Sequence, residues 1–202
     1  MTEKLSTQEE LELLVQKIRR CTVCAAHLPL GPRPVVHLHS EARILIVGQA
    51  PGRRVHETGI SWDDPSGDRL RDWMGIDRDV FYNVRKIAIM SAGFCYPGRH
   101  PRGGDLPPRP ECMPLWHPQV LPLLPKIELT ILAGTYAQKG YLKNRRKSSL
   151  TDTVKHWKSY IPRFLPLPHP SARNIAWFQS NPWFEEEVVP YLRDRVHTIL
   201  SL

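Results

Sequence analysis

Four short apolar runs recur along this chain, and they constrain its fold more than any other feature. They occupy residues 43–48, 86–91, 129–133 and 163–167. Runs of this length, bounded by glycine, proline or polar residues, are typical of strands buried on both faces of a parallel sheet. Helical patterns separate them. We therefore predict a three-layer α/β/α sandwich around a mainly parallel four-stranded sheet.

Helices are expected before, between and after these runs. Residues 7–20 carry apolar side chains at helical spacing and open with a capping-box pattern, Thr7 and Glu10. A short helix is expected at 69–75, and another over TYAQKGYL after the third run. The last helix is expected to begin with Asn181 as its cap.

The length and charge of the chain bound its class. Its 202 residues suit one compact domain, and we expect 1–202 to fold as a unit, as a monomer. No apolar run reaches the ~18 residues of a membrane span, so no membrane partner is expected. The N-terminus, MTEKLSTQEELELL, lacks the pattern of a secretory signal, which predicts a cytoplasmic protein. The net charge of +8 suits either capture of a polyanion or simple solubility.

The cysteines and prolines together predict a long loop that a metal holds in place. Prolines cluster between residues 97 and 125, which predicts a long ordered loop, because helix and strand interiors exclude proline. The chain has four cysteines, the number of ligands in a tetrahedral zinc site or an iron–sulfur cluster. Two of them bracket most of the loop, which favours a loop held by a metal. The four are Cys21, Cys24, Cys95 and Cys112.

Two motifs follow strands, where sites in open parallel sheets usually lie. The first run leads into GQAPG, residues 48–52, whose small side chains let backbone amides approach a ligand. The fourth leads into LPHPSARN, where Pro170 restricts the backbone of His169 and so aims its ring. Taken singly, GQAPG suits a structural turn equally well, and a surface-loop histidine is the better explanation of an isolated HPS.

Taken together and in order, the motifs resemble the uracil-DNA glycosylase superfamily, and its iron–sulfur branches, families 4 and 5, most closely. The set is CTVC, VGQAPG, ETGISWDDPSGDRL, GFCYPG, PECMPL and LPHPSARN, and it covers most of residues 10–195. The resemblance implies a monofunctional DNA glycosylase that everts uracil or another deaminated base and hydrolyses its N-glycosidic bond. It also implies a structural [4Fe–4S] cluster on the four cysteines, with zinc as the alternative.

The same resemblance assigns the chemistry to three residues. Gln49 would place water or contact the base, but an amide cannot act as a general base. The carboxylate that activates water and stabilises the cationic sugar is then expected at Asp64, or with less support at Asp63. The alternative is that Asp64 only caps a helix beginning near Ser66. His169 would donate a hydrogen bond to the base oxygen that gains negative charge.

The remaining matched positions are expected to bind substrate. Trp62 matches an aromatic residue that stacks on the everted base, and a core tryptophan is the alternative. Ser91 stands where family 4 has a uracil-selecting asparagine, so strict uracil specificity is not expected. Ser171 begins the loop that enters the duplex, and Arg173 stands where many relatives have an apolar wedge. The small residues expected at the site are Gly48, Ala50, Pro51 and Gly52.

The sequence is also compatible with other functions. The departures at Gln49 and Ser91 are compatible with a catalytically weak or inactive iron–sulfur protein that binds nucleic acid or lesions without cutting. GQAPG alone would also suit a different hydrolase or a nucleotide-binding α/β protein. In the proline-rich segment, Arg99, Arg102 and Arg109 are expected to contact phosphates.

Overall fold

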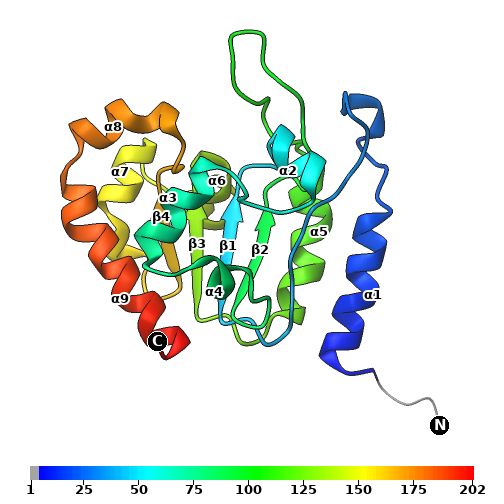
Figure 1. The fold of residues 1–202 in the computed structure, drawn as a ribbon, viewed down its shortest axis with the longest axis horizontal. Coiled ribbons are helices and arrows are strands. Elements are labelled where there is room, and N and C mark those ends of the chain that lie inside the picture. Colours follow the sequence, from blue (N-terminus) through cyan, green and yellow to red (C-terminus); the bar gives the residue numbers. More distant parts are fainter. Residues whose placement is uncertain (1–4) are drawn as a thin grey trace.

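The computed structural model describes residues 5–202 and contains a four-stranded sheet in the order β2-β1-β3-β4, with every pair of neighbours parallel (Figure 1). The strands lie within one residue of their predicted positions, because short buried runs bounded by turns leave little freedom for their ends. The predicted α/β fold class is confirmed. The strands are β1 (Ile44–Gly48), β2 (Ile87–Ser91), β3 (Leu129–Ala133) and β4 (Phe164–Leu167).

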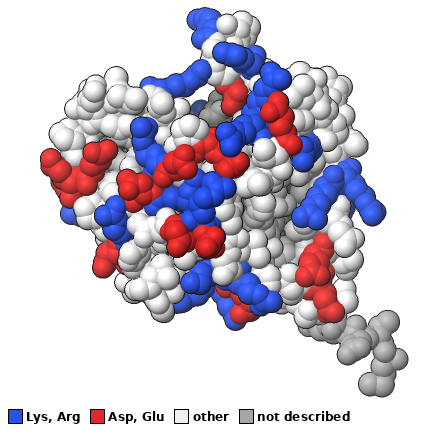
Figure 2. Space-filling model, viewed as in Figure 1, with Lys and Arg blue, Asp and Glu red and all other residues white. Residues whose placement is uncertain are grey.

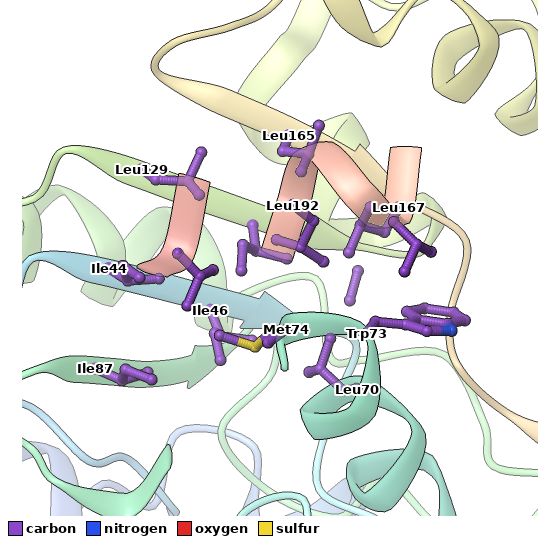
Figure 3. Close-up of a cluster of buried hydrophobic side chains, with 14 of the residues drawn as sticks. Ile44, Ile46, Leu70, Trp73, Met74, Ile87, Leu129, Leu165, Leu167 and Leu192 are labelled. Carbon is purple, nitrogen blue, oxygen red and sulfur yellow. The ribbon is translucent and has the colours of Figure 1, made fainter. Parts of the chain in front are cut away.

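Helices cover both faces of the sheet. Alternate side chains of β1 point to opposite faces, so that Ile44 and Ile46 join one core cluster while Leu45 and Val47 join the other. The first cluster, drawn in Figure 3, packs β1 and its neighbours against side chains such as Trp73. Its helices include α3 (Pro65–Met74), α4 (Arg78–Tyr82) and α9 (Val189–Leu200), and those of the second cluster are α1 (Thr7–Arg19), α5 (Cys112–Val120) and α6 (Thr135–Leu142).

The remaining helical segments are short. Helix α2 (Arg53–Thr58) lies beyond the upper ends of β1 and β2 in Figure 1. The others are α7 (Leu150–Lys155) and α8 (Ile175–Ser180), with 3₁₀ turns at Ala25–His27, Leu121–Leu123, Lys143–Arg145, Trp157–Ser159 and Ala172–Asn174. Within residues 5–202, no helix has the length and apolar character needed to cross a membrane.

Two helix starts differ from the sequence expectation. The capping box of α1 is formed by Ser6 and Glu9, one residue before the predicted pair: the Glu9 carboxylate accepts from the Ser6 N–H at 2.7 Å. Both pairs match the capping pattern, and the observed register buries Leu11 and Ile18. Helix α3 begins at Pro65 rather than at residue 69, because proline is pre-organised for the first helical position.

Prolines explain the other two differences. The predicted loop over 97–125 is wrong from Cys112 onward, where α5 begins; Pro114 lies in its first turn, where no N–H is needed, and only Pro118 is interior. The last helix does not begin with Asn181 as an α-helical cap. A π-helical turn, Phe184–Val188, leads into α9, next to Pro190, which has no N–H for a regular ladder.

Candidate functional site

A pocket of about 350 Å³ lies at the carboxyl ends of the strands, and Gly104 and Asp105 of the projecting loop, residues 99–105 between β2 and α5, form part of its wall. This loop stands at the top of Figure 1. The pocket is walled by the loop after β1, by α2, by the segment that leads into α3, by the end of β2, and by the projecting loop and the loop after β4. This is the position expected for a ligand site in a parallel sheet. The sequence-predicted residues that line it are Gln49, Ala50, Pro51, Gly52, Trp62, Asp64, Ser91, His169, Ser171 and Arg173.

Gly48 lies just behind the wall, where it leaves room for Trp62. A Cβ at Gly48 would stand 2.9 Å from the indole ring and 3.4 Å from Oγ of Ser91. Trp62 has a φ of 59° and is only 7% exposed, and its ring stacks on His169 with 5.4 Å between centroids. Trp62 is thus both a core residue and a pocket wall. Its stacking on a base stays a prediction.

Asp64 caps helix α3 and also lines the pocket. Its Oδ1 accepts a hydrogen bond of 2.8 Å from the Gly67 N–H, so the helix-capping alternative describes a real contact. The neighbouring Asp63 does not line the pocket. It pairs instead with Arg78 at 3.0 Å and Arg54 at 3.4 Å, and the hydrogen bond from Arg78 lowers the pKa of the Asp63 carboxyl. Of these two neighbouring carboxylates, only that of Asp64 is therefore available to a ligand in the pocket.

His169 is held by the backbone around it. Asn174 donates from Nδ2 to the His169 carbonyl at 2.7 Å, and Arg69 donates to the Pro170 carbonyl at 3.1 Å. Desolvation lowers the pKa of His169 below its ordinary value, against the opposing effect of the nearby Asp64 charge. The neutral ring therefore predominates near pH 7, and it donates from one nitrogen only.

A buried histidine that the sequence reasoning missed supports the Ser91 wall. Nε2 of His117 lies 3.0 Å from the Ser91 carbonyl, and Nδ1 lies 2.9 Å from the Tyr141 hydroxyl. A carbonyl can only accept, so Nε2 carries the proton and Nδ1 accepts from Tyr141. Desolvation lowers the pKa of His117 to about 4, which keeps the ring neutral. His117 lies in α5, within the proline-rich stretch that was expected to be a loop.

The projecting loop adds two pocket residues that no motif marked, Gly104 and Asp105. A Cβ on Gly104 would lie 1.7 Å from Nη1 of Arg173, so the arginine packs directly on the glycine backbone. Gly104 also has a φ of +85°, a conformation that glycine adopts readily. The loop after β4 and the projecting loop thus meet at the mouth of the pocket.

The four cysteines line a second cavity, on the α1 side of the sheet. Cys21 and Cys24 follow α1, Cys95 follows β2, and Cys112 opens α5. All four are free thiols. Desolvation raises the pKa of Cys95 to about 11 and that of Cys112 to about 12, so these buried thiols ionise only beside a compensating positive charge.

One feature of the cavity suits thiolate ligands, and another does not suit a single metal ion. The Phe94 N–H donates to Sγ of Cys112 at 3.3 Å, the kind of hydrogen bond that stabilises thiolate sulfur. In the part of the chain that the structure describes, however, no three His, Cys, Asp or Glu side chains are grouped closely enough to hold a single metal ion. The thiols therefore share one cavity without forming a mononuclear site.

The arginines of the proline-rich segment separate into two groups. Arg99 and Arg102 are exposed on the projecting loop, where Figure 2 shows Lys and Arg side chains at the top of the molecule. Arg109 instead pairs with Glu111 at 2.7 Å and lines the cysteine cavity. Of the three, only Arg99 and Arg102 are therefore exposed and outside the cysteine cavity.

Comparison with known families agrees with this geometry. Residues 36–193 match the family model described as the uracil DNA glycosylase superfamily. The matched stretch runs from before β1 into α9, so it contains all four strands and every sequence-predicted pocket residue.

Proposed function

Since this chain belongs to the uracil DNA glycosylase superfamily, we propose that it is a monofunctional DNA glycosylase, which hydrolyses the N-glycosidic bond of uracil or another deaminated base in DNA. The observation that carries this proposal is the convergence of Gln49, Asp64 and His169 on one pocket. A base inside a duplex cannot reach such a pocket, so the target nucleotide must be everted into it.

The pocket supplies groups for both charges that develop as the bond breaks. Positive charge grows on the sugar, and the Asp64 carboxylate offers it a negative partner. Negative charge grows on the departing base, and the neutral His169 ring offers its N–H to a base oxygen. Preorganised charges and dipoles of this kind are the main source of catalysis in many enzymes. The Gln49 amide has a donor and an acceptor, and we assign it to orienting the base or a water molecule.

We propose a class of substrates that is wider than uracil alone. The support for this class is that Ser91, which lines the pocket, offers a hydroxyl, whereas an amide could match the ring N–H and carbonyl of uracil together. Hypoxanthine and xanthine share the N–H next to a carbonyl that deamination creates. We therefore propose deaminated bases as the substrate class.

Base release from defined oligonucleotides tests the function. Labelled DNA, single- and double-stranded, carrying one uracil, hypoxanthine or xanthine is incubated with the protein, and abasic sites are revealed by alkali. We expect product with at least one base, and a loss of about 100-fold or more in Asp64→Asn. Asp79→Asn removes an equal charge on exposed α4 and should retain the wild-type rate. No product from any of the substrates would contradict the proposal.

We also propose that the cysteine cavity holds a [4Fe–4S] cluster. Its support is the convergence of four thiols from three segments of the chain, together with the Phe94 N–H that donates to Cys112. A tetrahedral zinc site would need sulfurs within about 4 Å of one another. A cluster bonds each thiolate to a different iron and keeps the sulfurs farther apart. Bound there, it would supply a cross-link between α1, β2 and α5.

The cofactor proposal has an optical and a chemical test. The purified protein should be brown, with broad absorbance near about 400 nm, and should contain iron and acid-labile sulfide. Cys112→Ser should lose most of both. A colourless protein that contains zinc alone would contradict the cluster and would leave the glycosylase proposal standing.

One alternative function rests on the same residues. Gln49 and Ser91 lack the groups that a strict uracil glycosylase would use, so a protein that binds lesions without excising them is the second candidate. It predicts tight binding to DNA with a uracil or hypoxanthine, no base release, and unchanged affinity in Asp64→Asn. In both cases DNA is the proposed partner, with Arg99 and Arg102 as phosphate contacts. A monomer in the cytoplasm stays a prediction.

A further inference from the structure

The pocket contains a second carboxylate, Asp105, at the base of the projecting loop. The backbone there is well fixed. Arg99 and Asp105 form an antiparallel bridge, and the Leu106 N–H donates to the Gly98 carbonyl at 2.8 Å. Asp105 therefore lies in the paired stem of the loop rather than in its turn.

The carboxyl of Asp105 turns toward the wall opposite the loop. A Cβ on Gly52 would stand 3.6 Å from its Oδ2, so the carboxyl lies beside the GQAPG loop, although the residue as a whole is exposed. Within residues 5–202 its oxygens accept no hydrogen bond and join no ion pair. By contrast, one oxygen of Asp64 is committed to the cap of α3.

We infer that Asp105 is a second catalytic carboxylate, the general base that takes a proton from the attacking water, while Asp64 stabilises the cationic sugar. This rests on the proposed glycosylase function. The C1′–N bond breaks and its electron pair leaves with the base. The water oxygen bonds to C1′, and its proton passes to the Asp105 carboxylate and then to solvent. Two carboxylates in different environments also divide the work in the hydrolysis of O-glycosidic bonds, although one of them acts there as a general acid.

The surroundings of Asp105 suit this role. Desolvation raises the pKa of its carboxyl above the ordinary value and the charge of Asp64 adds to the rise, whereas Arg173 and Arg99 oppose it. Desolvation and the charge of Asp105 raise the pKa of Tyr96, so this nearby phenol is neutral near pH 7. A carboxylate of raised pKa holds a proton more firmly and so accepts it more readily from water.

Asp105→Asn tests the assignment, because it keeps the size of the side chain and removes the basic oxygen. Single-turnover excision is measured on a labelled strand with one uracil and on one with hypoxanthine, across pH 4.5–8, beside DNA affinity. We expect a loss of about 100-fold or more near pH 7, with unchanged affinity. His169 also titrates on the acid side, so the wild-type rate should fall steeply there and that of Asp105→Asn less steeply.

The outcomes separate the two proposals. A wild-type protein that releases base, with Asp105→Asn at the same rate or lower by one constant factor at every pH, overturns the general-base assignment alone. A wild-type protein that releases no base from either strand overturns the glycosylase proposal, and the role of Asp105 with it. Asp79→Asn, which removes a charge outside the pocket, is the matched control and should follow the wild-type profile.

Discussion

At the scale of single residues, Asp64 has two tasks that substitutions can separate. Asparagine is as good a helix cap as aspartate, so Asp64→Asn should keep the hydrogen bond to Gly67 while losing the charge in the pocket. Asp64→Ala loses both, and we expect it to be less stable than Asp64→Asn by about 1 kcal/mol. Urea unfolding measures this difference. Equal stability of the two variants would mean that the cap contributes nothing.

The buried His117 should make the stability of the protein fall on acidification. Its pKa is about 4 in the fold and near its ordinary value of 6.5 in the unfolded chain, so between these values the unfolded state binds more protons. The free energy of unfolding should therefore decrease as the pH falls from 6.5 to 4, by up to about 3 kcal/mol.

His117→Gln isolates this contribution. The amide can still donate to Ser91 and accept from Tyr141, but it does not titrate. We expect the stability gap between wild type and His117→Gln to shrink as the pH falls from 7.5 to 4.5. A gap that stays constant over this range would show that His117 titrates normally in the fold.

Sequence motifs identified most of the pocket but not all of it. Gln49 and His169 sit in short patterns directly after strands, so their convergence could be expected from the topology, while Asp64 lies in the motif that leads into α3. Asp105 could not be found that way. It reaches the pocket only because the loop folds back on Arg99 and lies against Gly52, contacts that no local pattern encodes. The glycines before it, in GGD, were the sole signal.

At the scale of elements, the start of α3 is tightly constrained by the backbone next to it. A Cβ on Gly67 would stand 1.7 Å from the Trp62 carbonyl oxygen, and backbone cannot move aside as a flexible side chain can. Alanine favours a helix over glycine by about 1 kcal/mol, but overpacking costs about 1–3 kcal/mol, so the clash wins. We expect Gly67→Ala to destabilise the protein and to slow base excision by shifting Trp62 and Asp64.

Gly140→Ala is the matched control. It is also a glycine inside a helix, α6, but the atoms that its Cβ would meet belong to the flexible Met113 side chain. We expect its free energy of unfolding to stay within about 1 kcal/mol of wild type, because methionine adapts its rotamer. Urea unfolding of both variants tests the contrast. Equal costs would mean that the space around Gly67 is not limiting.

The observed helices and strands agree with the sequence-based predictions where one hydrophobic pattern dominates. The predictions failed where prolines are dense. The strands and α6 had clear apolar runs or helical spacing. In α5, prolines suggested a loop, yet Pro114 occupies a first-turn position and Trp116 and Val120 supply a buried face. Burial of that face in the second core cluster outweighs the hydrogen bond lost at Pro118.

At the scale of the whole molecule, the cysteine cavity lies between helices and a strand that the β-sheet alone does not hold together. It links the end of α1 to β2 and α5. If a cluster is bound there, removing it should loosen α1 more than the β-sheet, since metal binding contributes directly to folding free energy. Hydrogen exchange should show faster exchange in residues 7–19 of Cys112→Ser than in β1 or β3. Unchanged protection of α1 would contradict a structural role.

The central claim is that an everted nucleobase enters the pocket formed by Gln49, Asp64 and His169. A crystal structure with DNA tests it most directly, using a 2′-fluoro analogue of whichever deaminated nucleotide the wild-type protein cleaves, since fluorine slows departure of the base. We predict that the base lies in the pocket with His169 at its oxygen and Asp64 beside its sugar. A base that stays stacked in the duplex, or that binds elsewhere on the protein, would contradict the account.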